Sequence, residues 1–135
     1  MTAKEYLMQV RGLETELQAK NRLLQKLREK SVSLTSPQYG DKVNSSRCDS
    51  NLIDRIVDLE NEIKSRNSQL LDKITEINKR IECVHDPLLI AVLTDRYINH
   101  QSWEQIAENF DKSDRTVRVW HGQALQIFRK ETGMK

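Results

Sequence analysis

The chain has 135 residues, with 22 Lys and Arg against 20 Asp and Glu and a formal net charge of +2. Charged residues make up 31% and aromatic residues 5%, and Gly and Pro together number six, a balance that favours long helices over sheets. The length allows one small domain, with or without an extended appendage, and leaves little chain for the deep pocket of an enzyme. The net charge is too small for a general nucleic-acid coat.

The first predicted helix begins at a capping box and runs to about Lys30. Thr2 and Glu5 have the spacing at which each side chain hydrogen-bonds a free backbone amide near a helix start. Apolar residues then recur at alternating steps of four and three. They are Tyr6, Val10, Leu13, Leu17, Leu24 and Leu27. Such a stripe is typical of a coiled-coil helix.

A polar interval over 31–50 separates this helix from a second one. The interval contains Pro37 and Gly40 and has no apolar period, so it predicts a long loop. A second helix starts near Asp49 or Ser50, and an apolar stripe follows it. The stripe consists of Leu52, Ile56, Leu59, Ile63, Leu70, Ile74, Ile77, Ile81 and Val84, widened by Ile53, Val57 and Leu71. Its width predicts contact with more than one partner helix.

These two helices cannot each bury a stripe alone. They either fold back as an antiparallel hairpin or pair between chains, and their similar lengths favour the hairpin. We therefore expect residues 1–85 to form a helical hairpin that also mediates homo-oligomerisation, with a dimer favoured. A self-contained hairpin packed on its own C-terminal domain is the alternative. Cys48 and Cys83 are isolated, which favours reduced thiols over a disulfide across the hairpin.

A third helix is predicted at the start of a C-terminal domain over 86–135. Asp86 is a good helix cap, and Pro87 suits the first helical position because no amide donor is needed there. The residues from Leu88 to Ile98 are apolar on most sides, so we expect this helix to be the buried support of the domain.

Two further helices follow, separated by a short turn. Ser102 and Gln105 form a second capping box that opens a helix over 103–109. After a turn at 110–112, Ser113 caps a last helix that reaches about Glu131. The apolar positions expected between the two helices are Trp103, Ile106, Ala107, Phe110, Val117 and Trp120. The sequence therefore predicts an all-α chain whose C-terminal part is a three-helix helix-turn-helix domain.

This motif predicts binding to double-stranded DNA, because the outer face of its second helix enters the major groove. The candidates for reading bases are Asp114, Arg115, Arg118, Val119 and Gly122. The candidates for contacts with the DNA backbone are Lys112, Ser113, Thr116, Gln123, Arg129 and Lys130. Between Lys112 and Lys130 the only acidic residue is Asp114, so the basic charge belongs to the last helix. Arg115 and Arg118 are also the residue type that contacts guanine through two hydrogen bonds.

Other functional classes have little support in the sequence. His85, His100 and His121 are dispersed, and Cys83 with His85 would need two more ligands for zinc, so no metal and no cofactor is expected. No phosphate-binding loop or nucleophile motif occurs, so we expect no enzyme activity. The N-terminus has no signal-peptide core and no run is long enough to span a membrane, which predicts a cytoplasmic protein with no membrane partner.

The C-terminal residues resemble the fourth conserved region of bacterial sigma factors over 89–130. The resemblance rests on Arg96-Tyr97, on residues 102–107 and 113–118, and on Ala124-Leu125. The whole chain, with its opening residues 2–7 and the segment 56–63, is similar to small prophage proteins of Gram-positive bacteria, sigma-like proteins or phage late-transcription regulators. This similarity implies a helical N-terminal part and control of phage transcription in a bacterial host. The chain departs from the usual motif at Asp111, where Gly is common.

The leading hypothesis is a sequence-specific DNA-binding phage transcription regulator that oligomerises through its N-terminal helices. A sigma-like factor that binds RNA polymerase through the acidic helix with Glu104 and Glu108 is one alternative. A phage DNA-packaging component resembling a small terminase subunit, or a structural coiled-coil adaptor, are the others. The target sequence and the direction of regulation do not follow from the chain.

Overall fold

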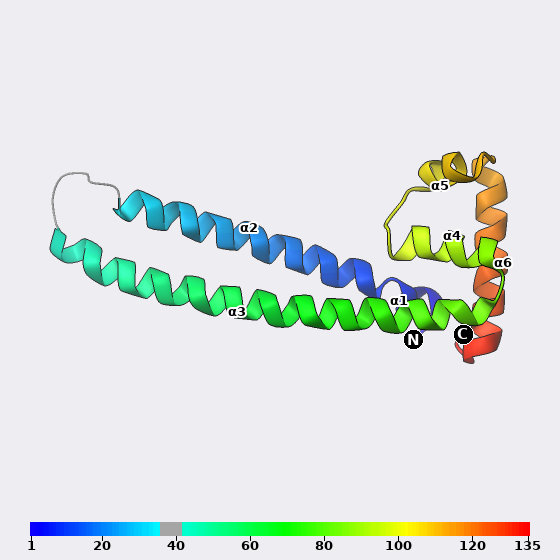
Figure 1. Cartoon of the computed structure of the whole chain (residues 1–135), viewed down its shortest axis with the longest axis horizontal. Coiled ribbons are helices and arrows are strands. Elements are labelled where there is room, and N and C mark those ends of the chain that lie inside the picture. The colour runs from blue at the N-terminus through cyan, green and yellow to red at the C-terminus, as the bar shows by residue number, and fades with distance from the viewer. Residues whose placement is uncertain (36–41) are drawn as a thin grey trace. The chain divides into compact units, whose positions relative to one another are not determined.

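The computed structural model describes residues 1–35 and 42–135, and all regular elements in these residues are helices (Figure 1). The elements are α1 (Ala3–Leu7), α2 (Gln9–Thr35), α3 (Lys42–Ile81), the 3₁₀ turn η1 (Glu82–Val84), α4 (Pro87–Tyr97), α5 (Trp103–Phe110) and α6 (Asp114–Thr132). The all-helical class predicted from the sequence is confirmed for the described residues.

Two compact units divide the chain. One contains Glu14–Gln69, and the other joins Met1–Leu13 to Leu70–Lys135. This division by contacts falls elsewhere than the expected boundary between residues 85 and 86, because α1 and the end of α3 pack with the C-terminal helices. The first and last segments of the chain thus share a core.

In the unit over 14–69, α2 and α3 lie side by side and antiparallel (Figure 1). Three ion pairs link the helices in opposite chain order. They join Glu16 to Arg66 at 3.1 Å, Lys20 to Glu62 at 2.8 Å and Arg28 to Glu60 at 3.0 Å. Between them the predicted stripe residues Leu17, Leu24 and Leu59 are buried. Exposed ion pairs of this kind contribute little stability each, so the apolar seam provides most of the pairing energy.

The loop predicted over 31–50 is too long. Helix α2 continues to Thr35 and α3 already begins at Lys42, so 31–35 and 42–50 are helical. The rest of the predicted loop, 36–41, lies outside the described residues. Both strong helix breakers of the interval, Pro37 and Gly40, fall in that stretch, and the flanking residues contain no Gly or Pro. The positions of Pro37 and Gly40 therefore indicated the helix ends better than the point at which the apolar pattern stops.

The single first helix expected up to Lys30 is also wrong in detail. The capping box is present as predicted, with the Glu5 amide donating to Thr2 Oγ1 at 3.2 Å and the Thr2 amide donating to Glu5 Oε2 at 2.9 Å. However, α1 ends at Leu7, and a turn at Met8 precedes α2. The break places Ala3, Tyr6 and Leu7 of α1 in the core of the C-terminal unit, where all three are buried.

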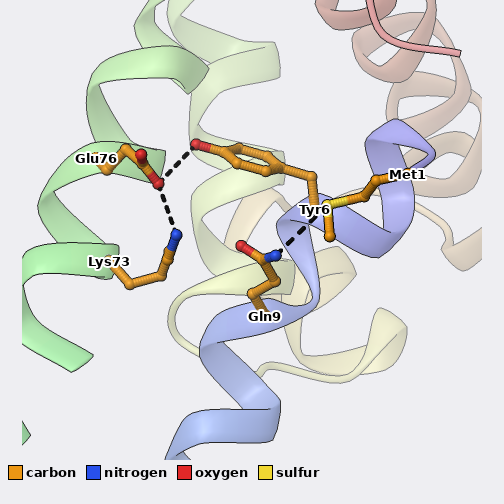
Figure 2. Close-up of polar contacts among 5 residues, drawn as sticks. All are labelled: Met1, Tyr6, Gln9, Lys73 and Glu76. Atoms are coloured by element: carbon orange, nitrogen blue, oxygen red, sulfur yellow. Dashed lines mark hydrogen bonds and ion pairs between the residues drawn. The ribbon is translucent and has the colours of Figure 1, made fainter. Parts of the chain in front are cut away.

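Tyr6 connects three helices of this unit. Its hydroxyl donates to Glu76 Oε2 at 3.1 Å, and the same carboxylate receives Lys73 Nζ at 3.0 Å (Figure 2). The Tyr6 ring stacks on Phe128 of α6, with centroids 6.3 Å apart, and lies 5.2 Å from the Arg80 guanidinium. Burial and the bond to Glu76 raise the pKa of Tyr6 to about 12, so the hydroxyl remains a donor at neutral pH. The Ala3 amide also donates to the carbonyl of Lys135 at 2.9 Å, which fixes both chain ends to one another.

Helix α4 begins as predicted. Asp86 accepts a hydrogen bond from the Leu88 amide at 3.0 Å, and Pro87 occupies the first helical position. The preceding residue, His85, has a left-handed backbone (φ 63°) that ends η1. Leu89, Val92, Leu93 and Tyr97 are buried. Helix α4 contacts both α5 and α6.

Candidate nucleic-acid interface

Helices α5 and α6 each begin at a capping serine, and a tight turn separates them. The Gln105 amide donates to Ser102 Oγ at 3.2 Å, and the Ser102 amide donates to Gln105 Oε1 at 2.9 Å, which completes the capping box of α5. Ser113 Oγ accepts from the Thr116 amide at 3.2 Å and so caps α6. Each cap satisfies amides that would otherwise lack a partner, worth about 1 kcal/mol of stability.

The turn between the helices depends on one left-handed residue. Asp111 has φ 53° and ψ 45°, and its amide donates to the carbonyls of Ala107 and Glu108. Gly is the residue that adopts this backbone most easily, and Asp is one of the few others that visit it. The departure from Gly noted in the sequence is therefore compatible with the turn.

The structure brings the six expected contact residues of α5 and α6 into one apolar cluster. Val92 of α4, Ile106, Ala107 and Val117 are its buried members, and Trp103, Phe110 and Trp120 pack against it. Phe110 and Trp120 meet edge to face, with centroids 6.0 Å apart. Ala107 is 6% exposed, and its small side chain lets the two helices approach. The cluster fixes which side of α6 faces outward.

Four of the five candidate base-reading residues form one exposed strip on α6. Arg115, Arg118, Val119 and Gly122 follow the spacing i, i+3, i+4 and i+7, and all are exposed. A Cβ added at Gly122 would meet nothing within 4 Å, so the surface there is open. The Val119 side chain is 52% exposed. The strip therefore presents the Arg115 and Arg118 side chains beside the exposed Val119 side chain and the open backbone at Gly122.

Asp114, the fifth candidate, forms an ion pair within α6. Its Oδ2 lies 3.2 Å from Arg118 Nη2, and the residue is only partly exposed. The acidic side chain in the first turn also interacts favourably with the positive end of the helix dipole. Asp114 thus holds Arg118 over the start of α6, and the Arg118 guanidinium lies 5.9 Å from the Trp103 ring.

The candidate backbone-contact residues separate into two groups. Lys112, Ser113 and Thr116 lie at the start of α6, and Ser113 Oγ and Thr116 Oγ1 are 2.8 Å apart. Arg129 lies sixteen residues after Ser113, which at the rise of an α-helix places it about 24 Å further along the axis. Lys130 follows it, and both are exposed. Gln123 is exposed between the groups. One phosphate cannot contact both ends of this set.

Residues that sequence reasoning missed lie on the inner side of the same helices. His121 Nε2 lies 2.6 Å from the Tyr97 hydroxyl. The His121 and Trp103 rings pack in a T-shaped arrangement with centroids 4.7 Å apart. The Arg96 guanidinium lies 4.2 Å above Trp103 and donates to the carbonyl of Gln101 at 3.2 Å. Helical spacing was a usable signal, since position 121 lies four residues after the core position Val117. The pairing with Tyr97, twenty-four residues away, had no such local signal.

Burial, followed by the charges of Lys4, Arg96 and Arg129, lowers the pKa of His121 from its ordinary value of 6.5 to about 4. Burial also raises the pKa of Tyr97. His121 is therefore neutral at physiological pH. Neither imidazole nor phenol adds charge to the exposed strip.

We expect acidification to destabilise the fold through His121. Between pH 6.5 and 4 the unfolded chain binds a proton that the folded chain does not, so stability is present above pH 6.5 and falls toward pH 4. Allowing for solvent screening of a partly exposed group, the loss is about 1–3 kcal/mol. Urea denaturation at several pH values measures it for wild type and His121→Gln. The difference between the two proteins should change over this range, whereas parallel pH profiles would show that His121 does not titrate in this way.

The comparisons with known proteins add no relative. No family model, curated protein or solved structure matches the chain. Within the part of the chain that the structure describes, no helix is long and apolar enough to cross a membrane, and no three metal-ligating side chains cluster. The function is therefore inferred from the geometry of α5 and α6.

Proposed function

We propose that the chain is a sequence-specific DNA-binding regulator that docks α6 of a helix-turn-helix, formed by α4, α5 and α6, into the major groove. The observation that carries the proposal is the exposed strip of Arg115, Arg118, Val119 and Gly122 on a helix whose opposite side is fixed by a packed cluster. An α-helix fits the major groove, and arginine makes two hydrogen bonds to guanine there. The resemblance to the fourth region of sigma factors and to prophage regulators supports the same reading.

Each residue of the strip has a physical role in this proposal. Arg115 and Arg118 donate to guanine edges, and Val119 contacts a thymine methyl group. Gly122 lets the helix backbone approach the groove because no side chain intervenes. Lys112, Ser113 and Thr116 contact the DNA backbone, where the amides at the start of α6 favour a phosphate.

We further propose that two copies act together through the unit over 14–69. Ile53 and Val57, four residues apart on α3, are 51% and 46% exposed, and Leu23 of α2 is 48% exposed. Ile53 and Val57 belong to the wide stripe predicted on the second helix, and Leu23 adds an exposed apolar side chain on α2. A dimer would bring two copies of α6 to one DNA site, which strengthens binding and sets the spacing of half-sites.

Light scattering of the full chain tests this arrangement. We expect the mass of a dimer, and Ile53→Glu with Val57→Glu should shift it toward the monomer because buried charges are costly. Arg22→Glu with Arg55→Glu, on exposed positions of the same two helices, is the control and should leave the mass unchanged. A monomer in the wild type would contradict the dimer, and a ring of many copies would favour a DNA-packaging component.

DNA binding itself is tested by fluorescence anisotropy with random duplex DNA at several salt concentrations. We expect the affinity to fall as salt rises, because cations on the protein release counterions from the DNA. Lys112→Ala, at a proposed backbone contact, should weaken binding and reduce the salt slope by about one unit. Lys26→Ala removes an exposed lysine from the other unit and should have no effect. Equal losses for both variants would mean that the affinity reflects overall charge rather than α6.

A further inference from the structure

A small cavity in the C-terminal unit is lined by three cations. It has a volume of about 200 Å³, and Lys4 of α1, Arg11 of α2 and Arg96 of α4 contribute to its wall. Met8, Tyr97 and Trp103 supply its apolar and aromatic sides. In the described part of the chain, no carboxylate lines the cavity and no carboxylate forms an ion pair with Lys4 or Arg96. Lys4 and Arg96 therefore bring positive charge to the wall that no ion-paired carboxylate offsets.

Packing fixes the Arg96 guanidinium in this wall. It lies 4.2 Å from the Trp103 ring, and Nη1 donates to the carbonyl of Gln101 at 3.2 Å. A guanidinium held this way keeps further N–H donors in a planar array that matches the oxygens of a phosphate. A site whose donors are already oriented loses less entropy when a ligand binds.

The positive charge also acts on the neighbouring core. Lys4 and Arg96 are among the groups that lower the pKa of His121, after the larger effect of burial. Both cations therefore lie close enough to the core to disfavour protonation of His121.

We propose that this cavity binds a small phosphorylated molecule, with its phosphate held by Lys4, Arg11 and Arg96 and its carbon skeleton against Trp103 and Met8. The charges of Lys4 and Arg96 favour a multiply charged oxyanion over a single carboxylate. The volume admits a phosphate with a short skeleton and excludes a large cofactor.

A free molecule fits the cavity better than a phosphate of the DNA backbone. None of the lining residues comes from α6. They belong to α1, the turn at Met8, α2, α4, the turn before α5 and α5. Helices α1, α4 and α5 cover the inner side of α6, opposite the exposed strip. DNA docked on the strip would therefore contact α6 rather than the cavity wall, with Trp103, 5.9 Å from the Arg118 guanidinium, as the nearest point between the two. The proposal does not depend on the DNA-binding function.

Isothermal titration of the full chain with pyrophosphate tests the site. We expect saturable binding of one pyrophosphate per chain and weaker binding of inorganic phosphate, with acetate as a singly charged comparison. Lys4→Gln with Arg11→Gln should weaken pyrophosphate binding at least fivefold more than Arg22→Gln with Lys26→Gln, which removes the same charge from exposed positions on α2. Circular dichroism establishes that both double variants remain helical. No saturable binding to the wild type, or a smaller difference between the variants, would overturn the proposal.

A DNA titration separates the two sources of phosphate. If the ligand is a free molecule, Lys4→Gln with Arg11→Gln and its charge-matched control should bind duplex DNA with the same affinity. If the cavity variant instead loses DNA affinity relative to the control, and pyrophosphate competes with DNA, the phosphate belongs to the DNA backbone. That result would overturn the assignment to a small molecule. If the wild type does not bind DNA at all, the pyrophosphate result still stands on its own.

Discussion

Replacement of Phe128 by Ala should lower the free energy of unfolding by about 3–5 kcal/mol, the usual cost of emptying a buried aromatic site. Phe128 is fully buried, and its ring stacks on Tyr6 at 6.3 Å between centroids. The substitution removes the contact by which α6 holds α1. Since whole domains are stable by only about 5–15 kcal/mol, the variant should be close to unfolding.

Urea denaturation at fixed protein concentration measures this loss, with Phe128→Leu as a milder variant expected to cost about 1 kcal/mol. Val117→Ala and Val119→Ala provide a matched comparison, because the same side chain is truncated on the same helix at 0% and 52% exposure. The buried position should cost clearly more. Similar values for the two valines, or a small loss for Phe128→Ala, would mean that α6 is not packed as described.

Arg118→Ala should weaken binding to a specific DNA site by about 1–3 kcal/mol, roughly 5- to 150-fold, and weaken binding to random DNA much less. The difference arises because a contact to a base edge is lost only where the correct base is present. The Arg118 side chain is 58% exposed, and its ion pair with Asp114 is a surface contact of small energetic value. Release of Arg118 to DNA therefore costs little.

Competition between specific and random duplexes in anisotropy measures this effect. Asp114→Asn is the informative companion, because it removes the ion pair but leaves Arg118 in place. It should retain specificity and bind all DNA somewhat more tightly, since a negative charge is lost. An equal loss on both duplexes for Arg118→Ala would make Arg118 a contact to phosphate rather than to a base.

Local chemistry was the part of this fold that the sequence predicted well. The caps at Thr2, Asp86, Ser102 and Ser113 all occur where the sequence placed them, and Asp111 adopts the left-handed turn. Each of these features depends on residues no more than four positions apart. The apolar cluster between α5 and α6 followed equally from helical spacing.

Contacts between distant segments were not predictable in the same way. The apolar period places Tyr6 on a stripe with Val10, but it does not indicate that Tyr6 reaches Phe128 and Glu76. The break at Met8 that permits this packing has no Gly or Pro beside it. The cavity with Lys4, Arg11 and Arg96 likewise joins residues from opposite parts of the chain.

Selection of duplexes from a random DNA pool by the full chain tests the DNA-reading role of α6 most directly. We expect a defined sequence to be enriched, and to occur as two half-sites if the protein is a dimer. Replacement of both Arg115 and Arg118 by Ala should abolish the enrichment. The same sequences enriched by the double variant, or no enrichment together with binding that is insensitive to salt, would contradict this role of α6.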